Sequence, residues 1–384
     1  MGVTELFGSG LWTLLSYVVP FLFVLTIVIF FHELGHFLTA RLCNVKIDAF
    51  SVGFGRAIVS WFDRHGTRWK IGWLPLGGYV SFRGDSSVAS TPDRALLEEA
   101  AKDPVEASQL FHNKPLGQRA AVVAAGPFAN FLVAILIFAA TFMVAGRQIV
   151  PPVAEAVQPD SPAAAAGMMP GDEIKSIDGR TIESFSDLQR IVGTSAGRPL
   201  TVVVLRNGQT VELTVTPANR EIEDRFGGKH RVGVLGITRS GQDGVRVERY
   251  GPIGALWEGT KQTWFVITST LGYVRDVIVG TQGAEQLGGP LRIAQMSGEV
   301  AGVSFLALLN LAAVLSVSIG LVNLFPIPIL DGGHLLYYAI EGVRGRPLSA
   351  RAQEVGFRVG MALVLMLMLF ATWNDLLHFE LFSF

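Results

Sequence analysis

Charged residues and cysteine are scarce in this sequence. Asp, Glu, Lys and Arg make up 16% of the 384 residues, whereas a soluble domain has about 25%. The net charge is −1 and no basic patch interleaves with aromatic residues, which argues against a nucleic-acid partner. The single cysteine, Cys43, excludes an intrachain disulfide bond and a cysteine-based metal cage. We interpret it as a passive residue at a helix end.

Apolar residues are correspondingly abundant, at 50% of the chain. Their long runs predict a polytopic α-helical membrane protein with about four transmembrane helices. The first run, residues 21–40, is long enough to cross a bilayer. No basic segment and no small-residue cleavage site precedes it, so we interpret it as a retained span rather than a signal peptide.

Three ionisable side chains, His32, Glu33 and His36, interrupt this first span. Charged types at the centre of a span cost about 2.5–3.5 kcal/mol each on insertion, so their presence requires a reason. His32 and His36 are four residues apart and project from one face of a helix. Two imidazoles so placed can bind one Zn²⁺, and Glu33 can take a proton from water at the metal. The alternative is a helix end in the membrane interface, which the desolvation cost disfavours.

Residues 47–54 and 69–82 read as β-strands separated by glycine, in a segment that is basic in places. We expect membrane-associated β-hairpins here, with an edge that could bind an extended peptide by strand addition. An ordinary connecting hairpin is an equal alternative. Residues 86–113 are polar and predict a surface helix and linker.

The second span, residues 120–146, contains Gly126, Pro127 and Asn130, which are unusual in a lipid-facing helix. Small residues allow close helix approach and Asn can bond across helices, which predicts packing against the first span. Asn130 could equally satisfy backbone groups that Pro127 leaves free.

Residues 151–217 differ in character from the spans. They predict a strand, a short Ala-rich helix, a turn, a strand, a helix and a β-hairpin that turns at Asn207 and Gly208. The pattern SPAAxAGxxxGDxIxxIDG resembles a circularly permuted PDZ domain, which would take a peptide as an added strand. The alternative is a small α+β spacer. The following residues 252–279 are amphipathic and predict an interfacial helix, although a partly buried span is not excluded.

The third span, residues 305–325, runs into PIPILDGGHLL. Asp331 at membrane depth needs a partner, and the proposed metal is a suitable one. Two His and one carboxylate, with a fourth position for water, form a catalytic zinc set. The alternative is a helix-capping Asp in a loop. We place His334 outside the ligand set.

Residues 359–373 form the apolar core of the fourth span. Neither tail contains Lys or Arg, whereas both loops next to the proposed site do. The positive-inside rule then predicts that both termini and the PDZ part lie outside, with the metal near the cytoplasmic face.

Four features together resemble the site-2 protease family: HELGH, GPFAN, the PDZ-like insert and NLFPIPILDGGH. The resemblance is greatest to bacterial regulator-of-sigma-E proteases, and it covers nearly the whole chain. It implies zinc held by His32, His36 and Asp331, with Glu33 as general base.

The resemblance also implies the residues that contact substrate. They lie in the turn that follows the third span and in a membrane-reentrant β-loop within residues 69–82: Asn323, Pro326, Pro328, Gly77, Gly78 and Tyr79. The implied substrates are single-pass membrane proteins already shortened by an upstream site-1 protease, such as anti-sigma factors and remnant signal peptides. The implied location is the bacterial inner membrane.

Two departures from the best-known members of that family concern gating and substrate choice. This chain has one PDZ-like unit rather than two, and Ser318 stands where those members have Asn. Two other functional classes stay open, an inert membrane-anchored PDZ scaffold and a transporter whose ion path contains the His, Glu and Asp side chains.

The predicted organisation has six parts. They are the first span with its zinc motif (1–42), a cytoplasmic-side loop with β-hairpins (43–119), the second span (120–146), the PDZ-like domain (150–250), an interfacial region (251–300), and the third and fourth spans (301–384).

Overall fold

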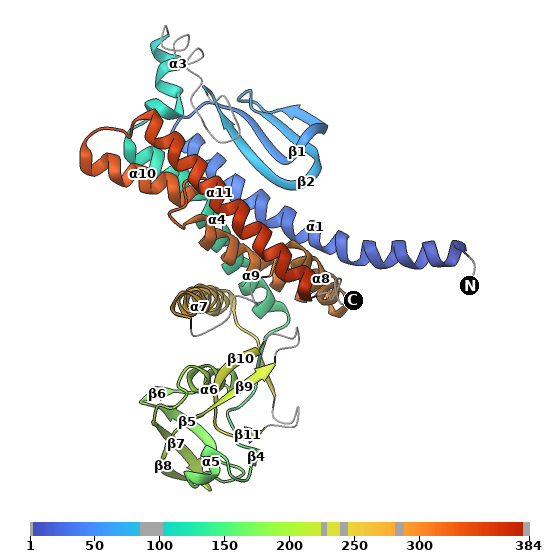
Figure 1. Cartoon of the computed structure of the whole chain (residues 1–384), viewed down its shortest axis with the longest axis vertical. Helices are drawn as coiled ribbons and strands as arrows, with labels where there is room; N and C mark the ends of the chain where they lie inside the picture. Colours follow the sequence, from blue (N-terminus) through green and yellow to red (C-terminus); the bar gives the residue numbers. More distant parts are fainter. Residues whose placement is uncertain (1–2, 85–102, 224–228, 239–244, 281–287, 379–384) are drawn as a thin grey trace. The chain divides into compact units, whose positions relative to one another are not determined.

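The computed structural model describes the chain except for residues 1–2, 85–102, 224–228, 239–244, 281–287 and 379–384 (Figure 1). It consists of two compact units. Unit 1 contains Met1–Ala140, Leu256–Gly272 and Leu287–Phe384, and unit 2 contains Thr141–Ala255 and Tyr273–Gln286. Most of the predicted linker at 86–113 lies outside the described residues.

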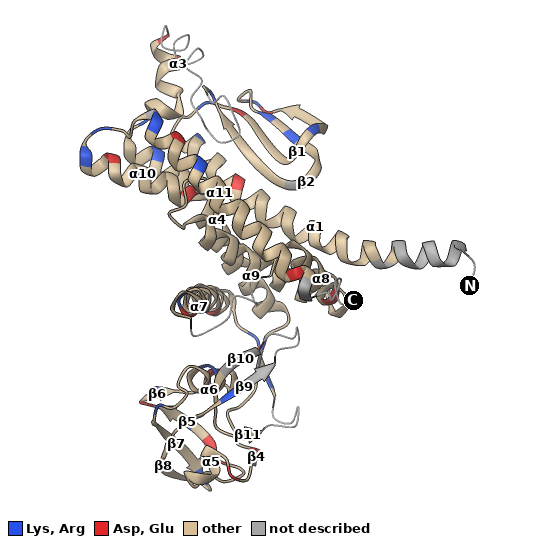
Figure 2. Ribbon diagram, in the orientation of Figure 1, with Lys and Arg blue, Asp and Glu red and all other residues tan. Residues whose placement is uncertain are grey.

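Four long helices lie wholly or mostly in unit 1. They are α1 (Val3–Leu42), α4 (Leu116–Val144), α9 (Phe305–Asn323) and α11 (Ala350–His378). Each contains a segment long and apolar enough to cross a membrane. These segments coincide with the four predicted spans, and the chain is a multi-pass membrane protein. Along these helices charged side chains are sparse, whereas Lys and Arg gather at the end of unit 1 that carries α10 (Asp331–Arg344) and the sheet (Figure 2).

Shorter helices complete unit 1: α3 (Pro104–Gln109), the 3-10 helix η1 (Phe111–Asn113), α8 (Pro290–Val303) and α10. Helix α8 packs on α1 and α9. Its N-terminus is capped by Asp375 of α11, whose buried carboxylate accepts hydrogen bonds from the backbone N–H groups of Gly289, Leu291 and Arg292. These are N–H groups that no intrahelical bond could satisfy.

The β-structure of unit 1 consists of two long bent strands, β1 (Ile47–Phe62) and β2 (Arg68–Phe82). Strand β1 is longer than predicted, because the glycines that suggested a break act as bends. Gly53 and Gly55 adopt φ near +85°, which only glycine tolerates easily, and the strand continues beyond them.

The bends fold the pair back on itself. Val52 of β1 faces Gly78 on one side and Ile71 on the other, while Val59 pairs with Ile71 as well. Residues 78–82 therefore form an outer edge of the sheet. Among the described strands, only β1 pairs with this edge segment.

The sheet is held against α1 by aromatic packing. Phe37 of α1 lies 5.3 Å from Phe50 and 5.1 Å from Trp69, measured between ring centroids. A charged contact adds to this at the β1–β2 turn. Burial raises the pKa of Asp63, but hydrogen bonds from Arg41, Trp69 and the turn backbone outweigh it and lower that pKa to about 2. The end of α1 and the sheet are therefore fixed together.

Unit 2 is built on a four-stranded antiparallel sheet in the order β6-β5-β7-β8. These strands are β5 (Glu173–Ile177), β6 (Arg180–Thr181), β7 (Leu200–Arg206) and β8 (Gln209–Val215). The hairpin between β7 and β8 turns at Asn207 and Gly208, as predicted, and both residues have positive φ.

Two helices and six short strands surround this sheet. The helices are α5 (Pro162–Ala165) and α6 (Phe185–Gly193), and α6 starts with a capping box formed by Ser184 and Asp187. The strands form three antiparallel pairs. They are β3 (Arg147–Ile149) with β12 (Arg246–Glu248), β4 (Ala156–Val157) with β11 (Ile237–Thr238), and β9 (Ala218–Glu223) with β10 (Lys229–Val234).

Helix α7 (Pro252–Val279) is a single amphipathic helix with the predicted bounds. Within unit 1 it approaches α4 closely, since a Cβ atom at Gly259 would lie 2.6 Å from the carbonyl oxygen of Ile135. Glu258 and Thr263 are buried, whereas Trp257 and Trp264 are exposed. Its location in the membrane interface stays a prediction.

Candidate metal centre and adjoining cavity

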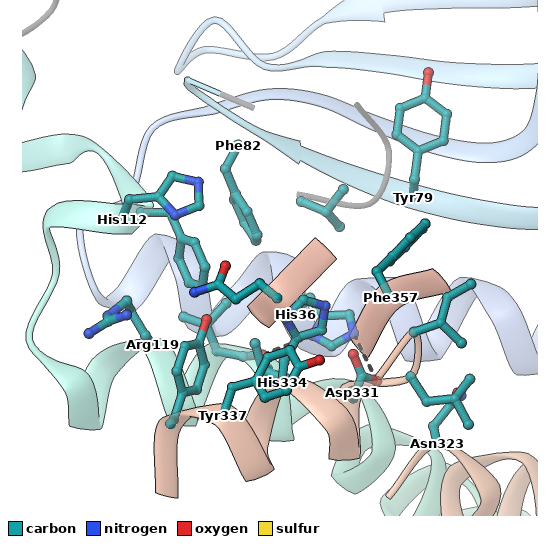
Figure 3. A pocket seen from close by; sticks show the side chains of 18 of the residues that line it. His36, Tyr79, Phe82, His112, Arg119, Asn323, Asp331, His334, Tyr337 and Phe357 are labelled. Carbon is teal, nitrogen blue, oxygen red and sulfur yellow. Dashed lines mark hydrogen bonds and ion pairs between the residues drawn. The ribbon is translucent and has the colours of Figure 1, made fainter. Parts of the chain in front are cut away.

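Two helices bring together the three side chains that the sequence singled out as metal ligands. His32 and His36 lie one turn apart on α1, with their Nε2 atoms 3.3 Å from each other. Asp331 is the first residue of α10, and its Oδ2 atom lies 3.2 Å from Nε2 of His32 and 3.6 Å from Nε2 of His36. Figure 3 shows His36 and Asp331 pointing toward one another.

These separations fit a zinc ion. Zn–N and Zn–O bonds of about 2.0–2.2 Å in tetrahedral geometry place neighbouring ligand atoms about 3.3 Å apart. The Oδ2 atom of Asp331 is buried and, among the described residues, accepts no hydrogen bond. An unpaired carboxylate oxygen that faces two imidazoles is suited to a cation, and this donor set of two nitrogens and one oxygen is typical of catalytic zinc.

The loop between α9 and α10 fixes Asp331. Two adjacent glycines let the loop backbone pass directly over the start of α10. A Cβ atom on Gly332 would lie 2.3 Å from the carbonyl oxygens of Leu324 and Phe325, and one on Gly333 would lie 2.3 Å from that of Ile327. Any larger residue at either position would push the loop away and move Asp331 with it.

Helix α4 supports both histidines from the side. The Nδ1–H group of His36 donates to the carbonyl oxygen of Val122 at 2.8 Å, which leaves Nε2 free to act as a ligand. Gly126 lies against the same ring, because a Cβ atom there would be 2.3 Å from Nε2 of His36. Asn130 of α4 reaches His32, with Nδ2 3.3 Å from Nδ1. Of the two roles left open for Asn130, the structure therefore shows the contact across helices.

Glu33 lies between the candidate metal ligands and the outer edge of the sheet. Its carboxylate accepts a hydrogen bond from the backbone of Val80. A Cβ atom on Gly78 would lie 3.0 Å from Cγ of Glu33. The glycine thus allows the edge strand to approach the carboxylate closely.

A cavity of about 540 Å³ opens beside these residues, and all of its lining belongs to unit 1. It contains His32, Glu33, His36 and Asp331 together with three of the six predicted substrate-contacting residues, Gly78, Tyr79 and Asn323. The other three, Gly77, Pro326 and Pro328, do not line it. Pro328 instead packs under α11, where a Cβ atom on Gly360 would lie 3.0 Å from its carbonyl carbon.

The polar end of the cavity was not predicted. Arg119 of α4 forms an ion pair with Glu341 of α10, and its guanidinium lies 5.0 Å from the ring centroid of Tyr338. His112 lies near Arg119, whereas His334 lines the cavity closer to Asp331 (Figure 3). The two charged residues are 222 positions apart in sequence, so no local pattern could have indicated their pairing.

The chain matches known proteins over most of its length. It is 50% identical over 364 residues to a protein of Rhizobium meliloti named as a predicted zinc metalloprotease, which covers 94% of this chain and 97% of the relative. It is 41% identical over 387 residues to the metalloprotease MmpA of Caulobacter vibrioides, with 95% and 96% covered. The profile of Peptidase family M50 matches residues 20–367.

Two solved structures match a smaller part of the chain. They are the PDZ domain of an SdrC-like protein from Listeria monocytogenes and an HtrA-type protease, AlgW, with a decapeptide. Each covers 22% of this chain with a TM-score of 0.18; identities are 21% and 25%, and the shares of the solved chains are 83% and 33%.

The relatives and the membrane helices define the class of this protein, a membrane zinc metalloprotease. The chain belongs to Peptidase family M50, the site-2 protease family.

Proposed function

We propose that this protein is an intramembrane endopeptidase, with zinc held by His32, His36 and Asp331. The observation that carries the proposal is the position of this triad in a cavity that also contains Glu33 and an open strand edge. Bound zinc supplies Lewis-acid chemistry, which polarises the scissile carbonyl group and makes water a nucleophile near neutral pH.

Glu33 acts as general base and then as general acid. It lies next to His32 in sequence and faces the cavity, where it takes a proton from the attacking water and passes it to the departing amide nitrogen. The hydrogen bond from Val80 fixes the orientation of the carboxylate.

The substrate binds as an added strand on residues 78–82. A helical amide is protected by its own hydrogen bond, so a transmembrane segment must be extended before it is cut. The outer edge of the sheet offers backbone groups for this purpose directly beside Glu33, and Gly78 lets the substrate backbone approach. Tyr79 and Asn323 line the same space and position the chain.

The substrates are single-pass membrane proteins already shortened by a site-1 protease, of the anti-sigma-factor or remnant signal-peptide kind. We place the protein in the bacterial inner membrane, with the termini and unit 2 in the periplasm. The distribution of Lys and Arg supports this orientation, because these residues gather at the end of unit 1 near the cavity (Figure 2). Unit 2, as a PDZ domain, binds or excludes substrate tails.

The decisive experiment reconstitutes the protein with a truncated single-pass substrate and maps the cut. Wild type should cleave within the membrane segment, and a chelator should stop the reaction. Glu33→Gln should lower the rate by about 10²–10⁴-fold, the usual contribution of a general base, while zinc content and fold stay unchanged. Wild-type cleavage by Glu33→Gln would exclude Glu33 as the base.

A second variant tests the ligand set. Asp331→Ala removes one of three ligands, so elemental analysis of the purified protein should show reduced zinc. Full zinc occupancy in Asp331→Ala would remove Asp331 from the set and leave the role of Glu33 to be judged separately.

A further inference from the structure

Asn130 is the one buried amide that touches a proposed zinc ligand among the described residues. It is fully buried on α4, and its Nδ2 atom lies 3.3 Å from Nδ1 of His32. Its Oδ1 atom is also buried and has no hydrogen-bond partner. A buried oxygen without a donor is uncommon in native structures and calls for an explanation.

The orientation of this amide conflicts with zinc binding by His32. A neutral imidazole that binds metal through Nε2 carries its hydrogen on Nδ1. The amide NH₂ of Asn130 would then face another donor, because Nδ2 can donate but cannot accept. Rotation of the amide by 180° exchanges Oδ1 and Nδ2 within almost the same volume. It would place the unpaired oxygen against the Nδ1–H group.

The hydrogen-bond partner of His36 shows what a rotated Asn130 amide would provide for His32. Nδ1 of His36 already has a carbonyl acceptor, Val122 O, at 2.8 Å on the same helix. With its oxygen turned inward, Asn130 would give His32 the same kind of acceptor. Val122 and Asn130, both on α4, would then supply the Nδ1–H acceptors of His36 and His32.

The backbone of Asn130 is held independently of its amide. Ser316 of α9 donates from Oγ to the carbonyl oxygen of Asn130 at 2.9 Å. A Cβ atom on Gly320 would lie 3.0 Å from Cβ of Asn130, so α9 packs tightly against this point. The amide can therefore rotate while its attachment stays fixed.

We propose that Asn130 is a positioning residue of the zinc site. In the zinc-loaded protein its Oδ1 accepts the Nδ1–H hydrogen bond of His32, which fixes the tautomer and the ring orientation that Nε2 ligation requires. The proposal rests on the ligand set of the proposed function.

The test is zinc affinity, measured on the purified full-length protein by competition with a chelator. Asn130→Leu keeps a similar volume and removes the acceptor, so its zinc affinity should fall by about 10–100-fold, as for other outer-shell partners. Asn130→Asp keeps an oxygen acceptor, so it should stay within a few-fold of wild type. Asn113→Leu is the matched control, since Asn113 is exposed, lies outside the cavity lining and donates its amide hydrogen bond to Ala107 O, so its zinc affinity should not change.

Two results would overturn the proposal. One is an unchanged affinity in a folded Asn130→Leu. The other is a loss in Asn130→Asp as large as in Asn130→Leu, because a carboxylate supplies an acceptor but no donor. If Asn130→Leu does not fold, a loss of about 10–100-fold in Asn130→Asp alone would overturn the proposal. His32→Ala separates this failure from failure of the zinc site itself, since undiminished zinc in that variant would refute the ligand set.

Discussion

The core of unit 2 and the candidate metal site of unit 1 are built from different kinds of side chain. Unit 2 closes around an aliphatic cluster in which Ile174, Ile177, Leu200 and Val204 are completely buried. The buried centre of unit 1 beside the cavity instead contains imidazoles, carboxylates and an amide, separated by glycines. In an aliphatic core, the stabilisation of the fold is spread over many side-chain contacts. The proposed metal centre depends on single contacts. We therefore expect its substitutions to have larger effects, and effects confined to zinc binding and cleavage.

The largest effect should follow from Gly126→Ala. The new methyl group would overlap Nε2 of His36, which the Val122 hydrogen bond holds in place, so the ring must leave its ligand position. Because a proposed ligand itself is displaced, zinc affinity should fall by more than the factor of about 10–100 that is typical of an outer contact. Cleavage should fall with it. Chelator competition and a substrate assay measure the two losses.

Gly117→Ala is the control for this substitution. Gly117 lies on the same helix, and no atom lies within 4 Å of the place that its new methyl group would occupy, so Ala should leave zinc and cleavage unchanged. Equal behaviour of the two variants would contradict the dependence of the proposed metal centre on single contacts.

A core substitution in unit 2 should give an intermediate effect of another kind. Leu188 of α6 is 2% exposed within the aliphatic cluster. Leu188→Ala should lower the free energy of unfolding of unit 2 by about 2–5 kcal/mol, through lost burial and the remaining cavity. Hydrogen exchange of unit 2 peptides in the full-length protein measures this loss. Zinc content should be unchanged, and a loss of zinc would show that the units are not independent.

The smallest effect concerns the acid stability of unit 2. Hydrogen bonds from Arg206, at 2.8 and 2.7 Å, outweigh burial and hold the pKa of Asp172 below its ordinary value. A carboxyl group with a lowered folded pKa stabilises the fold above its unfolded pKa of about 4, and this contribution is lost as pH falls through the folded value. Protection of unit 2 from hydrogen exchange should therefore decrease in acid.

Arg206→Met should flatten this decrease, because the group that lowers the pKa of Asp172 is gone. The exposed ion pair of Arg198 with Asp178 provides the comparison, and Arg198→Met should leave the pH dependence nearly as in wild type. An identical pH profile in all three proteins would contradict the assignment.

Much of the fold could be predicted because its signals are local. Apolar runs indicated the four spans, and the four-residue spacing of His32 and His36 placed both imidazoles on one helix face. In unit 2 the alternation of strands and the Asn207–Gly208 turn indicated the hairpin that the structure contains. Glycine was the misleading signal in unit 1, where Gly53 and Gly55 bend β1 without ending it.

The candidate site was predictable only in part. Asp331 was expected near the histidines because an isolated carboxylate at membrane depth needs a cation. The role of Asn130 could not be settled, since cross-helix bonding and backbone satisfaction both require the same polar residue beside Pro127. Gly126 indicated that α4 packs against α1, but not that it contacts His36. Arg119 gave no sign of its pairing with Glu341, because that contact depends on how α10 lies against α4.

The dispersed origin of the metal centre has a consequence for synthesis of the protein. His32 and His36 emerge first, their supporting helix α4 follows, and Asp331 arrives only after unit 2 has been made. Ribosomes add about 5–20 residues per second, so the nascent chain exists for some time with an incomplete ligand set. With the proposed ligand set, we therefore expect the peptidase to become active only after α10 has been made.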